Sequence, residues 1–471
     1  MLSHPTAPAH VPTNGSTASE NLPNGAKHLI PAAKPWIERR QKRAGDEVWD
    51  PRAFALPQAA LSFRHGGRIG RPSVGGMSAT IGWHQGDNAM PSSQGRIQTT
   101  HVGSLPRPPE LVSVLLRRAK DEHVDSAAFD TAVAAAVTAV VARQKQAGID
   151  IPSDGEMSKI SYATYVTERL TGFSGDSPRR VPADLLEVPR YMKRLADSGG
   201  TPTLKRPCCT GAIHVRTTEP LEADLAHFAS ALKASGYTQS FMNAAAPGVI
   251  ALFQPNRYYP NDEAYLEALS QAMAAEYRRI VEAGHYLQID SPDLGAGRHT
   301  MYADLSEDEF IRRLDGHVAA LNAALAGIPQ DRVRLHLCWG NYEGPHTHDI
   351  AMARILPTVL RIRAGAISFE GANPRHAHEW VVFRDIKLPE DRVIIPGVVD
   401  SSTNFVEHPD LVAERLCRFA DMVGRDRVIA GTDCGFATVA DWNVVDPDIV
   451  WMKLEAMVEG ARRASRLLWK N

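Results

Sequence analysis

Sulfur and nitrogen donors lie close together in one short run of this sequence, His336-Leu337-Cys338, inside an apolar, strand-like segment. Side chains at positions i and i+2 of a strand point to the same side, so His336 and Cys338 can bind one metal ion together. Glu370 and Cys434 are polar residues at the ends of two later strand-like segments. Two thiolates, one imidazole and one carboxylate make a typical tetrahedral zinc site, and the sulfur donors argue against magnesium or calcium.

A zinc site rich in thiolate predicts a particular chemistry. Bound zinc lowers the pKa of an incoming substrate thiol, so a thiolate nucleophile exists at neutral pH without a general base. This predicts S-alkylation, with hydrolysis by zinc-bound hydroxide as the minor alternative. On spacing alone, a buried strand histidine and two inert core cysteines explain the same residues equally well.

Other histidine and cysteine groups are weaker candidates for a metal site. His346-Thr347-His348-Asp349 and His376-Ala377-His378-Glu379 follow strand ends by several residues, and we interpret their histidines as solvated loop residues. Cys208 and Cys209 are adjacent, so on a strand they point to opposite sides. Cys417 lies on an apolar helical stripe, which indicates core packing.

The elements that must position these residues alternate in type. From residue 96 onward, short β-branched, apolar runs alternate with longer stretches of helical period, which is typical of βαβ units. An apolar run at 207–215 is interpreted as an inserted strand. Eight principal strands are predicted, at 97–104, 149–156, 238–246, 285–292, 333–340, 366–373, 393–400 and 428–435.

Eight such units in one chain predict an α/β fold, a (β/α)8 TIM barrel spanning residues 96–471. No Gly-x-Gly-x-x-Gly follows any strand, which weakens a Rossmann interpretation. Helix start signals support the pattern: Ser306 precedes an acidic turn, and Asn261 opens another helix. Polar or small residues end every strand, and in a barrel those ends meet at the face where active sites are built.

Residues 1–95 differ from the rest, with ten prolines, eleven glycines and no sustained period of 2 or 3.6. This composition predicts a disordered N-terminal extension, with a targeting peptide as the alternative. Met77 and Met90 are alternative starts for the barrel. Over the whole chain, 52 basic and 54 acidic residues give a net charge of -2, which argues against nucleic acid as a partner.

Three sequence features bear on cellular location: membrane spans, a secretory signal and the number of cysteines. No uninterrupted apolar run approaches the roughly 18 residues of a membrane span, and the N-terminus lacks the apolar core of a secretory signal. Five cysteines, an odd number, do not make a disulfide framework. We therefore expect a cytoplasmic protein with a small-molecule partner and no membrane association.

Seven motifs occur in the order seen in one known family. Because of these motifs, the chain from about 97 to 471 resembles the catalytic C-terminal barrel of cobalamin-independent methionine synthase. The motifs are Val102-Gly103-Ser104-Leu105-Pro106, Asp154-Gly155-Glu156, Ile289-Asp290-Ser291-Pro292, His336-x-Cys338, Glu370, Pro396-Gly397-Val398-Val399-Asp400 and Asp433-Cys434-Gly435. The resemblance implies a zinc-dependent methyltransferase of methionine biosynthesis in a single-barrel form. It also implies that the substrates are homocysteine, or a related thiol, and a methyl donor.

The same resemblance assigns roles to residues. His336, Cys338, Glu370 and Cys434 would be the zinc ligands. Ser104, Glu156 and Asp290 would hold the amino-acid end of homocysteine, with the two carboxylates facing its ammonium group. On residue type alone, a strand-end cap or turn residue explains each of these three.

The family's long form carries a histidine just after the strand that matches 393–400, proposed as the acid that assists the leaving group. Here Asp400 is followed by Ser401-Ser402-Thr403. Asp400 and Ser402 are the catalytic candidates at this strand end, and the methyl donor stays open between a folate and a corrinoid.

Two alternatives to a methionine-synthase activity remain at this stage. One is another zinc-thiolate alkyltransferase or lyase, such as an enzyme similar to the epoxyalkane:coenzyme M transferases. The other is a catalytically idle relative that binds a thiol or a metal, for which Ser402 is the supporting feature.

Overall fold

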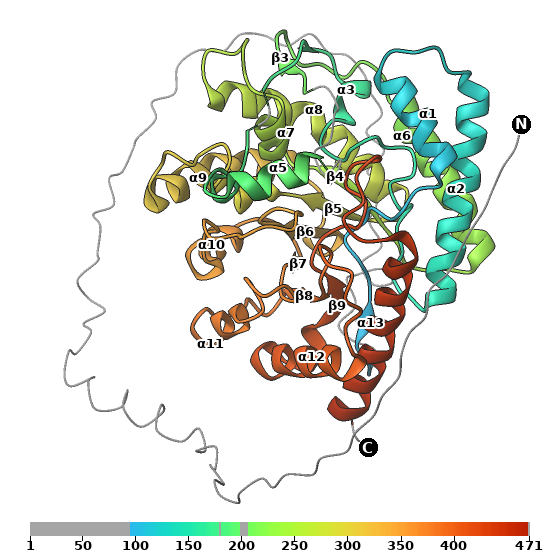
Figure 1. Ribbon diagram of the computed structural model, residues 1–471, viewed down its shortest axis with the longest axis vertical. Coiled ribbons are helices and arrows are strands. Elements are labelled where there is room, and N and C mark those ends of the chain that lie inside the picture. The colour runs from blue at the N-terminus through green and yellow to red at the C-terminus, as the bar shows by residue number, and fades with distance from the viewer. Residues whose placement is uncertain (1–94, 179, 198–205, 470–471) are drawn as a thin grey trace, which may run out of the picture. The chain divides into compact units, whose positions relative to one another are not determined.

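The computed structural model describes residues 95–178, 180–197 and 206–469, and a parallel β-sheet lies at the centre of this part of the chain (Figure 1). Its seven strands run in the order β1-β9-β8-β7-β6-β5-β4, and every neighbouring pair is parallel. All of their residues are buried. The strands are β1 (Gln98–Thr99), β4 (Phe241–Ala245), β5 (Tyr286–Asp290), β6 (Val333–Leu337), β7 (Ala366–Phe369), β8 (Val393–Val399) and β9 (Ile429–Thr432).

An extended segment, 150–152, joins the two edges of this sheet. The main-chain nitrogens of Asp150 and Ile151 donate to Thr99 O, and Phe241 N donates to Pro152 O. The segment therefore lies between β1 and β4 and closes the barrel, as predicted for 149–156. It is irregular because Pro152 has no N–H to donate and because the Asp150 side chain accepts the Thr99 N–H at 2.9 Å.

Helices surround the sheet, which confirms the (β/α)8 class (Figure 1). Ser306 and Asn261 cap their helices as predicted: Ser306 forms a capping box with Glu309, and Asn261 accepts the Ala264 N–H. The longer helices are α1 (Pro109–Ala119), α2 (Ser126–Ala147), α6 (Glu219–Ser235), α7 (Pro247–Phe253), α8 (Asp262–Glu282), α9 (Glu307–Ala324), α10 (Met352–Val359), α12 (Pro409–Val423) and α13 (Pro447–Leu468); α11 (Val382–Asp385) is a single turn.

Helix α2 is long and apolar enough to cross a membrane by length and composition alone. One stripe of its residues, including Val133, Val137, Val140 and Val141, is buried in the core of the described unit. This stripe packs against the barrel core.

An insertion follows the closing segment and carries small elements: α3 (Val166–Arg169), β2 (Phe173–Ser174), α4 (Ala183–Leu186), α5 (Pro189–Asp197) and β3 (Cys208–Cys209). Strands β2 and β3 pair antiparallel in a separate two-stranded sheet, so the run at 207–215 is an inserted strand, as predicted. Residues 1–94 lie outside the described residues, so the expected extension stays a prediction.

Candidate metal centre and substrate cavity

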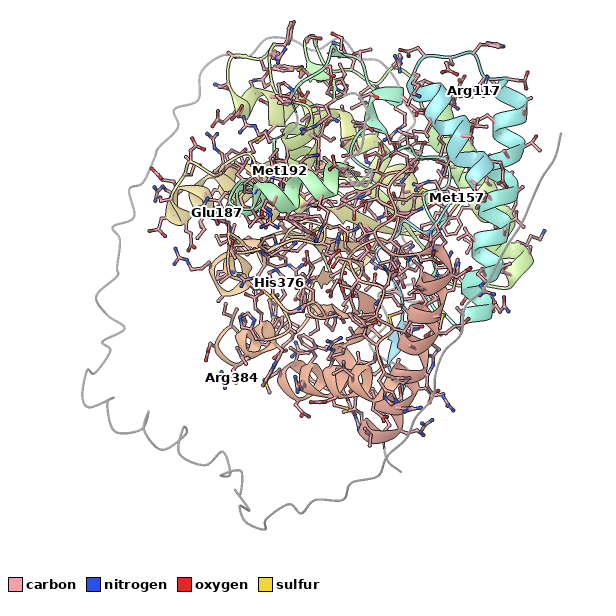
Figure 2. The ribbon with its side chains drawn as sticks, in the orientation of Figure 1. Arg117, Met157, Glu187, Met192, His376 and Arg384 are labelled. Carbon is pink, nitrogen blue, oxygen red and sulfur yellow. The ribbon has the colours of Figure 1, made fainter. Side chains whose placement is uncertain are left out.

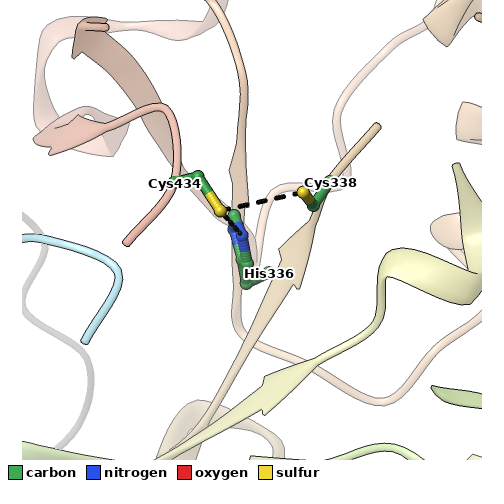
Figure 3. Close-up of side chains that lie close together, drawn as sticks. All are labelled: His336, Cys338 and Cys434. Carbon is green, nitrogen blue, oxygen red and sulfur yellow. Dashed lines mark hydrogen bonds between the residues drawn. The ribbon is translucent and has the colours of Figure 1, made fainter. Parts of the chain in front are cut away.

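Two barrel strands bring three candidate metal ligands together (Figure 3). His336 lies in β6, Cys338 follows that strand directly, and Cys434 follows β9. The Sγ atoms of Cys338 and Cys434 are 3.7 Å apart, and Cys434 Sγ is 3.6 Å from His336 Nε2. Within the described ranges, this is the one group of three or more His, Cys, Asp or Glu residues whose ligand atoms all lie within 4.8 Å of one another.

These separations fit one tetrahedral ion. Zinc bonds of about 2.3 Å to sulfur and about 2.05 Å to nitrogen at tetrahedral angles place two sulfurs about 3.8 Å apart and a sulfur and a nitrogen about 3.6 Å apart. Burial, with the charge of Arg334, lowers the pKa of His336 to about 3, so its imidazole is neutral and has a lone pair. The hydrogen bond with Cys434, together with burial, raises the pKa of Cys338, so two thiolates here need a cation.

Glu370 does not join this group. It follows β7, and its carboxylate accepts hydrogen bonds from Trp339 N and Asn373 Nδ2, both at 2.7 Å. Burial raises its pKa. Each oxygen keeps a further lone pair, so these two bonds do not exhaust the carboxylate as a ligand.

A cavity of about 600 Å³ opens beside the metal cluster, and its wall contains His336, Cys338 and Cys434. Ser104, Glu156 and Asp290 line the same cavity, so the structure brings the three predicted substrate residues to one place. All three are nearly inaccessible to solvent, between 2% and 5% exposed.

Glu156 is held by its main chain. Its φ of +58° lies in the left-handed region, and Asp154 Oδ1 accepts its N–H at 3.0 Å. The buried Arg107 donates twice to Glu156 O and once to Ala437 O, which ties this turn to the segment after Cys434. Glu156 Oε2 is buried without a hydrogen-bond partner among the described residues, as a ligand-binding oxygen would be.

Asp290 ends β5 and accepts hydrogen bonds from Asn243 Nδ2 and Gln288 Nε2, each at 2.9 Å. Burial and the charge of Glu156 raise its pKa to about 7. The charge of Lys159, whose Nζ donates to Asn243 O at 3.1 Å, lowers the pKa values of both carboxyl groups. The sequence analysis did not identify Lys159 as a site residue. Its position three residues after Glu156 was the one sequence feature that could have indicated it.

Two glycines make room for Ser104 and its neighbours. A Cβ atom at Gly435 would lie 2.1 Å from Ser104 Oγ, and one at Gly103, where φ is +142°, would lie 2.4 Å from Asn243 Oδ1. Close approach of three chain segments thus explains why glycine flanks both Ser104 and Cys434.

Asp400 and Ser402 are not among the residues that line the cavity. The Asp400 carboxylate accepts hydrogen bonds from Ser402 N, Ser402 Oγ and Thr403 Oγ1. These bonds make a turn of the kind that an aspartate forms with the residues after it. Their catalytic role stays a prediction, and this geometry does not favour it.

Three histidines, His299, His346 and His376, surround one buried carboxylate beside the cavity, and the sequence analysis interpreted two of them, His346 and His376, as solvated loop residues. Asp349 Oδ2 lies 3.0 Å from His346 Nδ1 and 3.1 Å from His376 Nε2, and Asp349 Oδ1 lies 3.1 Å from His299 Nδ1. That interpretation was wrong for His346 and His376, because the loops after β6 and β7 fold onto each other. His348 and His378 are exposed, as expected.

The charges in this cluster follow from its contacts. His376 faces carboxylates at both nitrogens, with Glu379 Oε2 2.8 Å from Nδ1, so both nitrogens must carry protons. Burial alone would lower the pKa of His376, but Asp349 and Glu379 raise it to about 10. Burial alone would raise the pKa of Asp349, yet the three histidines beside it hold that pKa well below its usual range.

The cavity wall also has apolar and cationic parts. Leu185 of α4 and Met192 and Leu195 of α5 line it; Figure 2 labels Met192. Arg180 and Arg206 belong to the same wall. The other three cysteines take no part: Cys208 and Cys209 are buried in β3, and Cys417 packs against the core from α12.

Comparison with known proteins finds a family model and relatives that match most of this chain. The family model for the catalytic domain of cobalamin-independent synthase matches residues 97–184 and 200–463. The methionine synthase of Saccharolobus solfataricus is 28% identical over 376 residues, which is 78% of this chain and 94% of that protein. The methionine synthase of Sulfurisphaera tokodaii is 26% identical over 374 residues, or 78% of this chain and 92% of that protein.

Solved structures show the same fold. A B12-independent methionine synthase from Shewanella sp. W3-18-1, in complex with selenomethionine, aligns with a TM-score of 0.60 and 18% identity, over 80% of this chain and 100% of that chain. A putative vitamin-B12 independent methionine synthase from Listeria monocytogenes aligns with a TM-score of 0.54 and 18% identity, over 78% of this chain and 98% of that chain.

Proposed function

This chain belongs to the cobalamin-independent synthase catalytic-domain family and is a methyltransferase, and from that premise we propose that it uses zinc to transfer a methyl group to the sulfur of homocysteine. The observation that carries the proposal is the placement of His336, Cys338 and Cys434 in one cavity with Glu156 and Asp290. A metal site for sulfur and an acidic site for an ammonium group lie in one space there, as an amino-acid thiol requires.

Zinc is the metal that this donor set favours. The spacing of two sulfurs and one neutral imidazole nitrogen matches tetrahedral zinc, and thiolates do not suit magnesium or calcium. When bound, zinc would stabilise the substrate sulfur as a thiolate at neutral pH. We keep Glu370 as the proposed additional ligand, supported by its burial at the end of the strand next to β6.

The amino-acid end of homocysteine is proposed to bind Ser104, Glu156 and Asp290. The unpartnered Oε2 of Glu156 suits an ammonium N–H, and Ser104 Oγ can donate to the substrate carboxylate. Two buried carboxylates disfavour a sulfonate thiol such as coenzyme M, because a second anionic group there would find like charge.

The methyl donor is proposed to occupy the remainder of the cavity, against Leu185, Met192 and Leu195. A cytoplasmic location is also part of the proposal, and it is supported by the five cysteines, which are all free thiols.

The test is a donor screen with the purified, zinc-loaded protein. Homocysteine is incubated with 5-methyltetrahydrofolate triglutamate or with methylcobalamin, and methionine is measured. We expect zinc-dependent methionine formation with one of the two donors. A folded protein holding one zinc per chain that methylates 2-mercaptoethanesulfonate as well as homocysteine would contradict the proposed substrate.

A further inference from the structure

His299 is a buried histidine that the proposed zinc and homocysteine sites leave unused. It follows η2 (Ala296–Arg298), the short 3₁₀ turn after β5, and its ring is part of the cavity wall. The turn is fixed against a proposed zinc ligand, because Ala296 N donates to Cys338 O at 3.0 Å. His299 therefore lines the same cavity as the metal cluster while contacting none of its ligand atoms.

One nitrogen of this ring lies beside a carboxylate. His299 Nδ1 lies 3.1 Å from Asp349 Oδ1, while Asp349 Oδ2 receives His346 and His376. Since His376 carries a proton on each nitrogen, Asp349 stays ionised, and an ionised carboxylate can only accept. In the neutral imidazole, a proton on Nδ1 therefore faces the carboxylate, and this leaves the lone pair on Nε2.

The other nitrogen has no use within the described residues. His299 is 1% exposed, and neither ring nitrogen makes a hydrogen bond of good geometry there; Nδ1 has the Asp349 carboxylate 3.1 Å away, whereas no ion pair forms at Nε2. A buried polar atom without a partner costs free energy, so such atoms are found where a ligand or a reaction uses them. The arrangement of carboxylate, imidazole and free ring nitrogen is that of an oriented general base.

We propose that His299, oriented by Asp349, carries the proton that the substrate thiol releases on binding at the metal site and delivers it to the leaving atom of the methyl donor. This rests on the proposed methyl transfer and adds a catalytic residue to it. No histidine follows Asp400, and His299 lines the cavity whereas the sequence-based candidates Asp400 and Ser402 do not.

Protons and electrons balance over one turnover of the proposed reaction. The S–H bond of homocysteine breaks, its proton binds His299 Nε2, and the electron pair stays on sulfur. That pair forms the S–CH₃ bond while the bond between the methyl carbon and the donor nitrogen breaks, leaving its electron pair on nitrogen. The proton on Nε2 then binds that nitrogen, which yields a thioether and a neutral amine and restores neutral His299. A donor with a nitrogen leaving group needs this proton, whereas a corrinoid does not.

The experiment compares two donors on the zinc-loaded protein with homocysteine. 5-Methyltetrahydrofolate triglutamate has a nitrogen leaving group that requires protonation, and methyl iodide has one that does not. His299→Asn keeps an amide N–H in the place of Nδ1 and removes Nε2. At a pH where the homocysteine thiol is already ionised on the protein, we expect a loss of roughly 100- to 1,000-fold in the rate with the folate and a change of under threefold with methyl iodide.

The matched control is His378→Gln, which changes an exposed histidine of the same loop cluster and should leave both rates unchanged. Zinc content and homocysteine affinity are measured for each variant. If His299→Asn does not hold zinc, His299→Gln, whose amide lies nearer the position of Nε2, is used instead.

An unchanged folate rate in a folded variant, or an equal loss with both donors, would overturn the role of His299. Wild-type turnover with methylcobalamin and none with the folate would overturn it too, because that donor needs no proton. Failure of the proposed function looks different: the zinc-loaded wild type would not speed the reaction of homocysteine with methyl iodide over the zinc-free protein.

Discussion

The substitution Glu156→Gln separates the binding of homocysteine from the stability of the fold, because the two effects have opposite signs. Gln has the same shape and tolerates the φ of +58° equally well, so the turn should persist. The change removes the negative charge from a side chain that is 2% exposed and whose Oε2 has no partner among the described residues.

The expected loss of affinity follows from the bond that disappears. A hydrogen bond between an ammonium group and a buried carboxylate is worth about 1–3 kcal/mol more than one that lacks the charge, so Kd for homocysteine should rise about 5- to 150-fold. The stability of the substrate-free protein should increase in this variant. Burial raises the pKa of Glu156, which means that the folded protein disfavours its ionised form at neutral pH. A neutral amide avoids that cost, so the melting temperature without substrate should rise.

Calorimetric titration with two thiols makes the assay specific. Homocysteine and 4-mercaptobutyrate differ only in the amino group, so wild-type protein should prefer homocysteine and Glu156→Gln should lose most of that preference. Zinc content should stay at one per chain. Glu187→Gln, a change at the exposed partner of His348 (Figure 2), is the control and should bind both thiols as the wild type does.

The result that would refute the reasoning is an equal weakening of both thiols. That outcome would mean that Glu156 shapes the cavity and does not contact the ammonium group. Unchanged homocysteine affinity would refute it as well, and would favour a substrate without an amino group.

Three further predictions concern the metal, the buried histidines and the N-terminal residues. Cys338→Ser and Cys434→Ser should abolish zinc retention in elemental analysis, whereas Cys417→Ser, which changes a helix residue outside the cluster, should keep one zinc per chain; retention by both site variants would contradict the ligand assignment. The pKa of His376 is raised from 6.5 to about 10, so its stabilising contribution is complete below about pH 6.5 and is lost as the pH rises through 10. The free energy of unfolding should therefore fall more between pH 7 and pH 10 for the wild type than for His376→Asn, and equal slopes in denaturant titrations would argue against the charged cluster. Deleting residues 1–90 should leave the fold and the activity intact, because that segment has no periodic apolar face to pack on the barrel; a loss of many degrees in the melting temperature of the truncated protein would contradict this.

The sequence predicts most of the barrel because strand ends carry a local signal. Apolar runs that finish in Asp290, in His336-x-Cys338 or before Cys434 identify β5, β6 and β9 and the face on which they end. The second barrel strand was predicted as regular, but Pro152 and the side chain of Asp150 replace its ladder hydrogen bonds. The hydrophobic periodicity of a sequence does not show which group forms the hydrogen bond with each main-chain N–H or C=O.

The histidine cluster could not be predicted in the same way. Asp349 collects His299, His346 and His376 from three loops, and 77 residues separate the first from the last. Closely spaced histidines in a loop look solvated in sequence, because only tertiary packing decides which of them is buried. A polar residue in a loop after a barrel strand is therefore a candidate for the functional site, even where the neighbouring residues indicate a solvated loop.

The groups proposed for metal and amino-acid binding lie at strand ends, and the group proposed for proton transfer lies on a loop. The groups proposed for zinc and the amino acid lie in strands or within a few residues of their ends, where parallel pairing fixes them; Asp290 pairs with His336 in adjacent strands. The proton-carrying group proposed here lies on a loop instead, and its orientation depends on a charge cluster made of two further loops. Changes in those loops can alter the protonation of a leaving group without moving the thiol site, because the strands do not shift with them. With the roles proposed above, loop sequence would set the choice of methyl donor, and the strands would set the choice of thiol.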